Sequence, residues 1–177
     1  ISKASLNRKT EFIWEGSRLL QEYAPNGVYS YVYTEQGSYE PLAQIFKPND
    51  SKAEREILYY HNDQIGIPRE LTDAEGNIVW SGEYSGWGKL TNPDHACLKK
   101  GVHQPFRLQN QYADEETGLH YNFFRYYDPH SGRFTQQDPI GLWGGDNLYR
   151  FGNSTQGWID LLGLEGKTAL QKFDDEY

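Results

Sequence analysis

At 177 residues the chain is long enough to form one domain with a hydrophobic core. Its formal net charge of −8 argues against a nucleic-acid interface, which needs clustered Lys and Arg. The single cysteine, Cys97, allows no internal disulfide, and no apolar run is long enough to span a membrane.

Aromatic residues make up 15% of the chain, with 14 Tyr, 8 Phe and 5 Trp, and 18 Gly and 8 Pro interrupt it. Aromatic side chains suit a pleated surface, and Gly and Pro end strands. The composition therefore predicts an all-β fold of short strands with frequent turns.

The first third of the chain alternates between strand and turn signals. Residues 1–10 are polar, and we expect them to fray or to pair with sequence upstream. From Glu11 to residue 46 the pattern reads strand, Gly turn, strand, turn, strand, with Tyr29, Tyr31 and Tyr33 on one side of the sheet. Residues 47–56 (KPNDSKAERE) are interpreted as a polar loop or a short helix.

The same alternation continues from residue 58 to residue 90, with turns expected at 62–63, at 74–77 and at the glycines between 82 and 88. Residues 92–101 (NPDHACLKKG) form a second expected loop, which covers the sheet. The stretch NFFRYYDPHSGRF predicts an aromatic strand, a turn at 128–132 and a returning strand.

Turn units spaced by roughly 15 to 25 residues predict stacked antiparallel hairpins in a repeat sheet. Because the chain begins at Ile1 and has neither Met nor a signal peptide, we expect it to be a piece of a longer protein. A repeat sheet that starts there exposes an edge, which predicts self-association or pairing with upstream repeats.

One five-residue phrase occurs twice near the end of the chain, as Asp138-Pro-Ile-Gly-Leu142 and as Asp160-Leu-Leu-Gly-Leu164. Asp followed three residues later by Gly suits a tight turn, because Asp bonds nearby backbone N–H groups and Gly takes a positive φ. Two such turns at adjacent levels of a sheet bring two carboxylates together. A close acidic pair divides into one proton acceptor and one proton donor.

A family resemblance is carried by the runs RYYDPHSGRF, TQQDPIGLWGGDNLYRF and WIDLLGL, and upstream by LYYHNDQIGIPRELTDAEGNIVWSGEYSGWGKL. Together they resemble the Rhs repeat-associated core domain of Rhs and YD-repeat polymorphic toxins and of toxin-complex C subunits. The resemblance covers residues 58–164. Residues 1–57 match only as degenerate YD-type repeats, and the charged residues 165–177 are expected to be a linker, a tag remnant or the start of a toxin domain.

The resemblance implies a large hollow β-cage of stacked hairpins around a downstream toxin, closed by a C-terminal plug segment. It also implies a site: Asp138 and Asp160 cleave the chain once, between Leu164 and Glu165, with Arg125 in support. This activity would be that of a self-cleaving, aspartic-type peptidase with no external substrate. The sequence departs from the family pattern at Ser154 and Leu161, where the family usually has proline after Asn and after Asp.

The implied partners are the enclosed toxin and the upstream Rhs repeats, in an effector that is secreted or delivered by a bacterial secretion system for antagonism between bacteria or against insects. No nucleic acid, membrane or cofactor is expected as a partner of this segment. No metal is expected either, since the five histidines lack metal-ligand spacing.

Alternatives to this interpretation remain open. The chain could be a non-catalytic YD-repeat module for adhesion or carbohydrate binding, with Trp80, Trp87, Trp143 and Trp158 in a groove, although tryptophans in a Tyr-rich sheet are more often core residues. Arg125 could instead stack on Tyr126 or Tyr127. His61 is interpreted as a packed turn residue.

Overall fold

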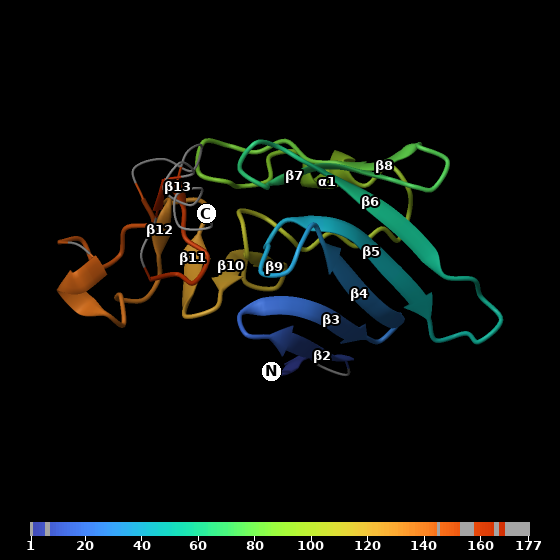
Figure 1. The fold of residues 1–177 in the computed structure, drawn as a ribbon, viewed down its shortest axis with the longest axis horizontal. Coiled ribbons are helices and arrows are strands. Elements are labelled where there is room, and N and C mark those ends of the chain that lie inside the picture. Colours follow the sequence, from blue (N-terminus) through green and yellow to red (C-terminus); the bar gives the residue numbers. More distant parts are fainter. Residues whose placement is uncertain (1, 6–7, 145, 153–157, 165–166, 169–177) are drawn as a thin grey trace.

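A computed structural model of the chain describes residues 2–5, 8–144, 146–152, 158–164 and 167–168. Within these residues the first eight strands form one antiparallel sheet, in which each strand pairs with the next along the chain (Figure 1). The strands are β1 (Ser2–Ser5), β2 (Arg8–Glu15), β3 (Arg18–Ala24), β4 (Gly27–Tyr33), β5 (Pro41–Pro48), β6 (Glu56–Asn62), β7 (Pro68–Thr72) and β8 (Ile78–Ser81). The all-β prediction is confirmed, and β6 continues the sheet across residue 57.

One face of this sheet carries the main hydrophobic core. Tyr29 and Tyr31 of β4 are buried on that face, and Tyr33 packs against the same core, as the alternation predicts. The segment that follows residue 101 crosses the face, where Phe106 packs edge-on against Tyr31 with ring centroids 4.7 Å apart. Burial of these rings supplies much of the stabilisation of the sheet.

Two expected loops differ in detail. Residues 49–55 form a loop without a helix, as one of the two readings of 47–56 predicts. Residues 92–101 contain the one-turn helix α1 (Pro93–Ala96), which begins at a proline after Asn92. Ala96 of this helix is buried in the main core, so the segment covers the sheet as expected. Neither α1 nor the other described helix, also of four residues, is long enough to cross a membrane.

A second, smaller antiparallel sheet lies beside the first and carries the order β12-β11-β10-β9 (Figure 1). Its strands are β9 (Tyr112–Asp114), β10 (Leu119–Asn122), β11 (Arg125–Asp128) and β12 (Arg133–Phe134). After it come the 3-10 helix η1 (Gly141–Gly144) and the pair β13 (Trp158–Ile159) and β14 (Lys167–Thr168). The strand β14 was not expected, because residues 165–177 lack an alternating pattern.

Several single-residue expectations are wrong. Trp80 is a core residue, but Trp143 is 92% exposed and Trp87 is exposed as well. His61 lies in the strand β6 with an exposed side chain that bonds the Thr72 hydroxyl. Trp87 and Trp143 lie outside the strands, and His61 points away from the face of β6 that carries Leu58 and Tyr60.

Candidate functional site

Both copies of the repeated phrase fold as the predicted turns. The Oδ1 atom of Asp138 accepts the Ile140 N–H at 3.0 Å, and Gly141 has φ +61°. The Oδ1 atom of Asp160 accepts the N–H of Gly163 at 2.7 Å and that of Leu164 at 3.0 Å. Gly163 has φ +71°, a conformation that glycine adopts without strain. Each turn therefore fixes its aspartate through bonds to the following backbone.

Arg125, the first residue of β11, brings the two carboxylates together. Its Nη2 atom lies 3.0 Å from Asp138 Oδ2 and 3.5 Å from Asp160 Oδ2. The three side chains are 1%, 5% and 2% exposed, in the order Arg125, Asp138 and Asp160. Residues far apart along the chain thus converge on one guanidinium in a dry environment.

The rest of the Arg125 guanidinium is held from several sides. Its Nη1 donates to the Leu148 carbonyl at 3.1 Å, and its Nε donates to the Gly163 carbonyl. Its Cζ lies 3.6 Å from the centroid of the Phe134 ring. The alternative that Arg125 stacks on an aromatic ring is therefore right in kind but wrong in the ring, because β12 places Phe134 under it.

Burial shifts the pKa of two of the three side chains in this site, Asp160 and Arg125. Burial raises the pKa of Asp160, although its backbone N–H bonds and Arg125 partly oppose the shift. The Oδ2 atom of Asp160 accepts no hydrogen bond from the described residues and faces Arg125 only across 3.5 Å. Burial lowers the pKa of Arg125, and the two aspartates oppose that shift. Two acids share one cation here, so a proton on Asp160 balances the buried charge.

Of the two residues that flank the predicted cleavage position, the structure describes Leu164, and this residue lies next to the site. The Leu164 N–H is the group bonded to Asp160 Oδ1, which places the backbone of Leu164 beside the carboxylate. Glu165, on the far side of the predicted cleavage, lies outside the described residues, as does Ser154.

A third copy of the phrase escaped the sequence interpretation. Residues 63–67 read Asp-Gln-Ile-Gly-Ile, and Asp63 Oδ1 accepts the Ile65 and Ile67 N–H groups in the same kind of turn. Asp63 pairs with Arg69 at 2.8 Å, but the two side chains are 22% and 44% exposed. A search of the sequence for all Asp-x-x-Gly phrases would have found it.

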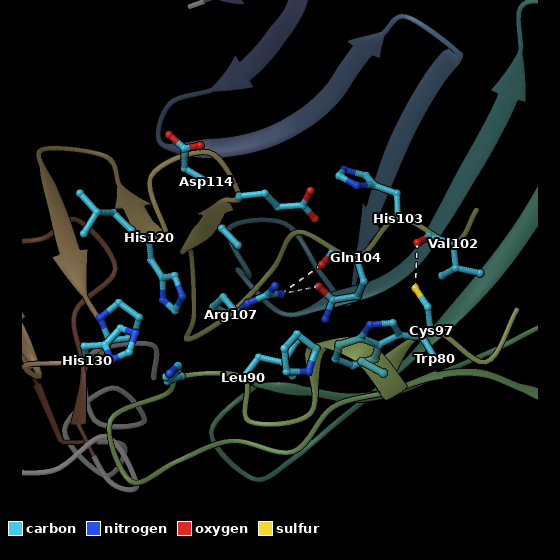
Figure 2. Close-up of a pocket in the computed structure, with 18 residues that line it drawn as sticks. Trp80, Leu90, Cys97, Val102, His103, Gln104, Arg107, Asp114, His120 and His130 are labelled. Atoms are coloured by element: carbon cyan, nitrogen blue, oxygen red, sulfur yellow. Dashed lines mark hydrogen bonds between the residues drawn. The ribbon is translucent and has the colours of Figure 1, made fainter. Parts of the chain in front are cut away.

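The pocket in Figure 2 is a separate feature, with a volume of about 380 Å³ between β8, residues 89–107 and the β9–β10 pair. Its lining includes Trp80, Gln104, Arg107 and His120 but none of the three residues of the acidic site. Arg107 is buried and donates from Nη1 to the Gln104 and Phe106 carbonyls. Neither Trp87 nor Trp143 lines this pocket, so the structure gathers no tryptophan groove there.

Metal ligands are not gathered anywhere in the part of the chain that the structure describes, where no three His, Cys, Asp or Glu side chains are placed to hold an ion. Cys97 is an exposed free thiol.

Comparison with known proteins places this chain in a family. A family model described as "RHS protein" matches residues 57–94. The double-stranded DNA deaminase toxin A of Burkholderia cenocepacia is 43% identical over 169 residues, which are 90% of this chain and 12% of that protein. The toxin protein Tse5 of Pseudomonas aeruginosa is 42% identical over 98 residues, which are 55% of this chain and 7% of that protein.

The fold has solved counterparts. The crystal structure of TcdB2-TccC3-TEV superimposes with a TM-score of 0.64 and 22% identity, over 92% of this chain and 9% of that one. The chain belongs to the Rhs family and comes from its core domain. It spans about a tenth of the length of the two toxins and of this structure.

Proposed function

We propose that this chain is the C-terminal part of an Rhs shell that encloses a downstream toxin domain and frees it by cutting itself once, between Leu164 and Glu165. The observation that carries the proposal is the convergence of Asp138 and Asp160 on Arg125, with the Leu164 amide bonded to Asp160. The names of two relatives support a toxin as the enclosed domain, because both contain the word toxin.

The cleavage is a hydrolysis in which water supplies both new end groups. An ionised carboxylate takes a proton from water as the water oxygen attacks the Leu164 carbonyl carbon. The tetrahedral intermediate then collapses, the bond to the Glu165 nitrogen breaks, and a protonated carboxyl gives its proton to that nitrogen. The products are a carboxyl group (–COOH) on Leu164 and an amine (–NH2) on Glu165, and the single proton of the dyad has moved from the acid to the base without net loss.

The geometry favours one assignment of the two roles. Asp138 has the shorter contact with Arg125, at 3.0 Å, and this close ion pair suits the role of base. Asp160 is more deeply buried, its pKa is raised, and its Oδ2 accepts no hydrogen bond from the described residues. That oxygen is the one available to carry the proton, so Asp160 is the acid.

The partners and the location of the protein belong to the same proposal. The shell would be completed by upstream Rhs repeats that pair with β1, which lies at one edge of the eight-stranded sheet. Residues 1–57 would be degenerate repeats, 58–164 the core and 165–177 the beginning of the segment that is released. The protein would act as a secreted or delivered effector.

The test is the intact mass, under denaturing conditions, of the full-length protein that carries this segment. The wild type should separate into two pieces with a new amino terminus at Glu165, at a rate that does not depend on protein concentration. Asp138→Asn and Asp160→Asn should stay whole, because each removes one proton-transfer group and keeps the turn.

Asp63→Asn is the matched control, since it changes the same kind of turn at an aspartate that pairs with Arg69 and not with Arg125, and it should be cut like the wild type. Equal cleavage in all four proteins, or a new terminus elsewhere, would remove the dyad from this function. A wild type that stays whole would favour the non-catalytic adhesion or carbohydrate-binding module.

A further inference from the structure

The backbone that leads to the proposed cut is held carbonyl by carbonyl. Four consecutive carbonyls, those of residues 160–163, each accept a hydrogen bond from the segment 110–125. In order along these carbonyls, the donors are Asn122 Nδ2 (2.8 Å), Asn110 Nδ2, the Phe124 amide (3.2 Å) and Arg125 Nε. The next carbonyl along the chain is that of Leu164, the group that the proposed reaction attacks.

Three of the four donors, all but Asn110, come from one compact device, the hairpin of β10 and β11. Asn122 ends β10 and pairs with Arg125, which begins β11, so the Asn donor and the guanidinium face each other across a hairpin with a two-residue turn. Any shift of this hairpin moves the Asn122 donor and Arg125 together. The device therefore fixes the distance between the backbone that it binds and the acids that Arg125 gathers.

We call the four donors and the carbonyls of residues 160–163 the clamp. It contains backbone conformations that residues other than glycine seldom adopt. Asn110 has φ +62° and Phe123 has φ +47°, the two positive values among described residues other than glycine. Asn tolerates this region moderately well, whereas Phe does so at a cost. Such strain persists where the surrounding structure enforces it, and it gathers at functional sites. Asn110 is itself one of the four donors, and Phe123 lies between two of them, Asn122 and the Phe124 amide.

The backbone of residues 160–163, which accepts these hydrogen bonds, packs closely against the hairpin. A Cβ atom on Gly163 would lie 2.7 Å from the Asn122 carbonyl oxygen, so no side chain fits there without a shift. Asn122 itself is 0% exposed, and its Oδ1 has no hydrogen-bond partner among the described residues. Burying an amide with one unbonded atom costs free energy. The hydrogen bond that Asn122 gains in this position is the one from its Nδ2 to the Asp160 carbonyl.

We propose that Asn122 and Asn110 are positioning residues that set the register of the cleaved segment, so that the Leu164 carbonyl and not a neighbouring one meets the acids. This role rests on the proposed self-cleavage. A slip by one residue would present the Gly163 or the Glu165 carbonyl instead, and the four ordered bonds oppose that slip. The two asparagines therefore determine which bond is cut.

The chain offers a matched control for Asn122. Asn62 ends β6, donates from Nδ2 to the Pro41 carbonyl at 2.8 Å, and also has an unbonded Oδ1, but it lies in the other sheet. Asn122→Ala and Asn62→Ala thus remove the same kind of bond. Asn110→Gly removes the second donor and keeps the positive φ, so it tests the clamp without added backbone strain.

The experiment measures the rate of cleavage and the masses of both pieces in the full-length protein. Asn122→Ala and Asn110→Gly should each slow the cut after Leu164 by about tenfold or more and should add products cut one residue away. Their pH profiles should keep the wild-type shape, because neither asparagine titrates. Asn62→Ala should be cut at the wild-type bond within about twofold of the wild-type rate, since Asn62 lies outside the clamp.

Two results overturn the role, and they are distinguishable from each other. A wild type that is never cut removes the proposed function and this role with it. A wild type cut after Leu164, with both clamp variants cut at the same bond and at the rate of Asn62→Ala, removes the positioning role alone. If Asn122→Ala does not fold, Asn110→Gly still decides between these results.

Discussion

The two sheets differ in what they bury. The core of the eight-stranded sheet is aromatic and aliphatic, and its fully or nearly fully buried members include Leu19, Tyr29, Tyr31, Leu58, Tyr60, Leu71 and Trp80. The region of the smaller sheet has an apolar cluster around Tyr127 and Phe134 as well, but it also buries many polar groups, namely Gln104, Arg107, Gln109, Gln111, His120, Asn122, Arg125, Asp138 and Asp160. An apolar core is stabilised by burial in any good packing, whereas each buried polar group needs its own partner.

The difference teaches where to look for function. The larger sheet also buries Glu22, but that carboxylate accepts bonds from Tyr31, Tyr112 and His103, and it ties the sheet to the segment that covers it. Single atoms stay unbonded among the described residues at Asp160 and Asn122, as they do at Trp14 and Asn62 of the larger sheet, but Asp160 and Asn122 belong to a network that also holds a second buried acid and a buried cation. Incomplete satisfaction of a buried network is costly, and it fits a site that must bind water and exchange protons.

The largest expected effect tests whether the polar core depends on its cation. Arg125→Met should lower the free energy of unfolding by about 3–5 kcal/mol, because it leaves the buried acid pair without its cation. Arg69→Met, at the exposed copy of the same turn, should cost at most about 1 kcal/mol. Denaturant unfolding of the two variants measures both values.

Similar losses in the two variants would contradict the contrast between the sheets. The loss in Arg125→Met should also shrink at acid pH, since protonation of the carboxylates removes the uncompensated charge.

Much of the larger sheet could be predicted from the sequence, because its strands carry a local signal. Alternation places Tyr29, Tyr31 and Tyr33 on one face, and glycines such as Gly16, at φ +59°, mark the turns. Aromatic alternation says which residues share a face. It says nothing about aromatic residues outside the strands, and that is why Trp143, in the 3-10 helix η1, was misplaced.

The acidic site could be predicted only in part. The repeated phrase identifies Asp138 and Asp160 as turn residues, and the family resemblance adds Arg125. The same phrase at Asp63 forms a comparable turn, so the motif alone does not separate a buried acid from an exposed one. The partners at Asn110, Asn122 and Phe134 depend on how distant segments meet, which no local pattern encodes.

A second test uses a titratable group of the polar core. His120 is buried, and its Nδ1 lies 2.9 Å from Gln111 Oε1. Burial, together with nearby Arg107, lowers the pKa of His120 to about 3 from its ordinary value of 6.5. The unfolded chain therefore takes up a proton between these values while the folded chain does not.

The stability that His120 contributes is present above pH 6.5 and is lost as the pH falls toward 3, with a slope that approaches about 1.4 kcal/mol per pH unit. His120→Gln should remove this slope, and His61→Gln, at an exposed histidine, should keep it. Unfolding curves between pH 7 and pH 4 provide the measurement. Parallel slopes in the two variants would show that His120 is not held neutral by burial.

The smallest expected effect on stability is that of a substitution at Trp143, at the boundary of the polar core. Trp143 lies in η1, directly after the Asp138 turn, and it is 92% exposed. A side chain with so little contact contributes little to stability, so Trp143→Ser should change the free energy of unfolding by no more than about 0.5 kcal/mol. Trp80→Leu, in the apolar core, should cost several times more, because it leaves a cavity.

Trp143→Ser should also be cut after Leu164 at the wild-type rate, since Asp138 is fixed by bonds to the Ile140 N–H and to Arg125 and not by the tryptophan. Denaturant unfolding and intact mass check the two expectations separately. A stability loss near that of Trp80→Leu would mean that Trp143 packs against a surface in solution. A slower cut at unchanged stability would mean that η1 helps to hold Asp138, and the boundary of the site would then move outward to include this turn.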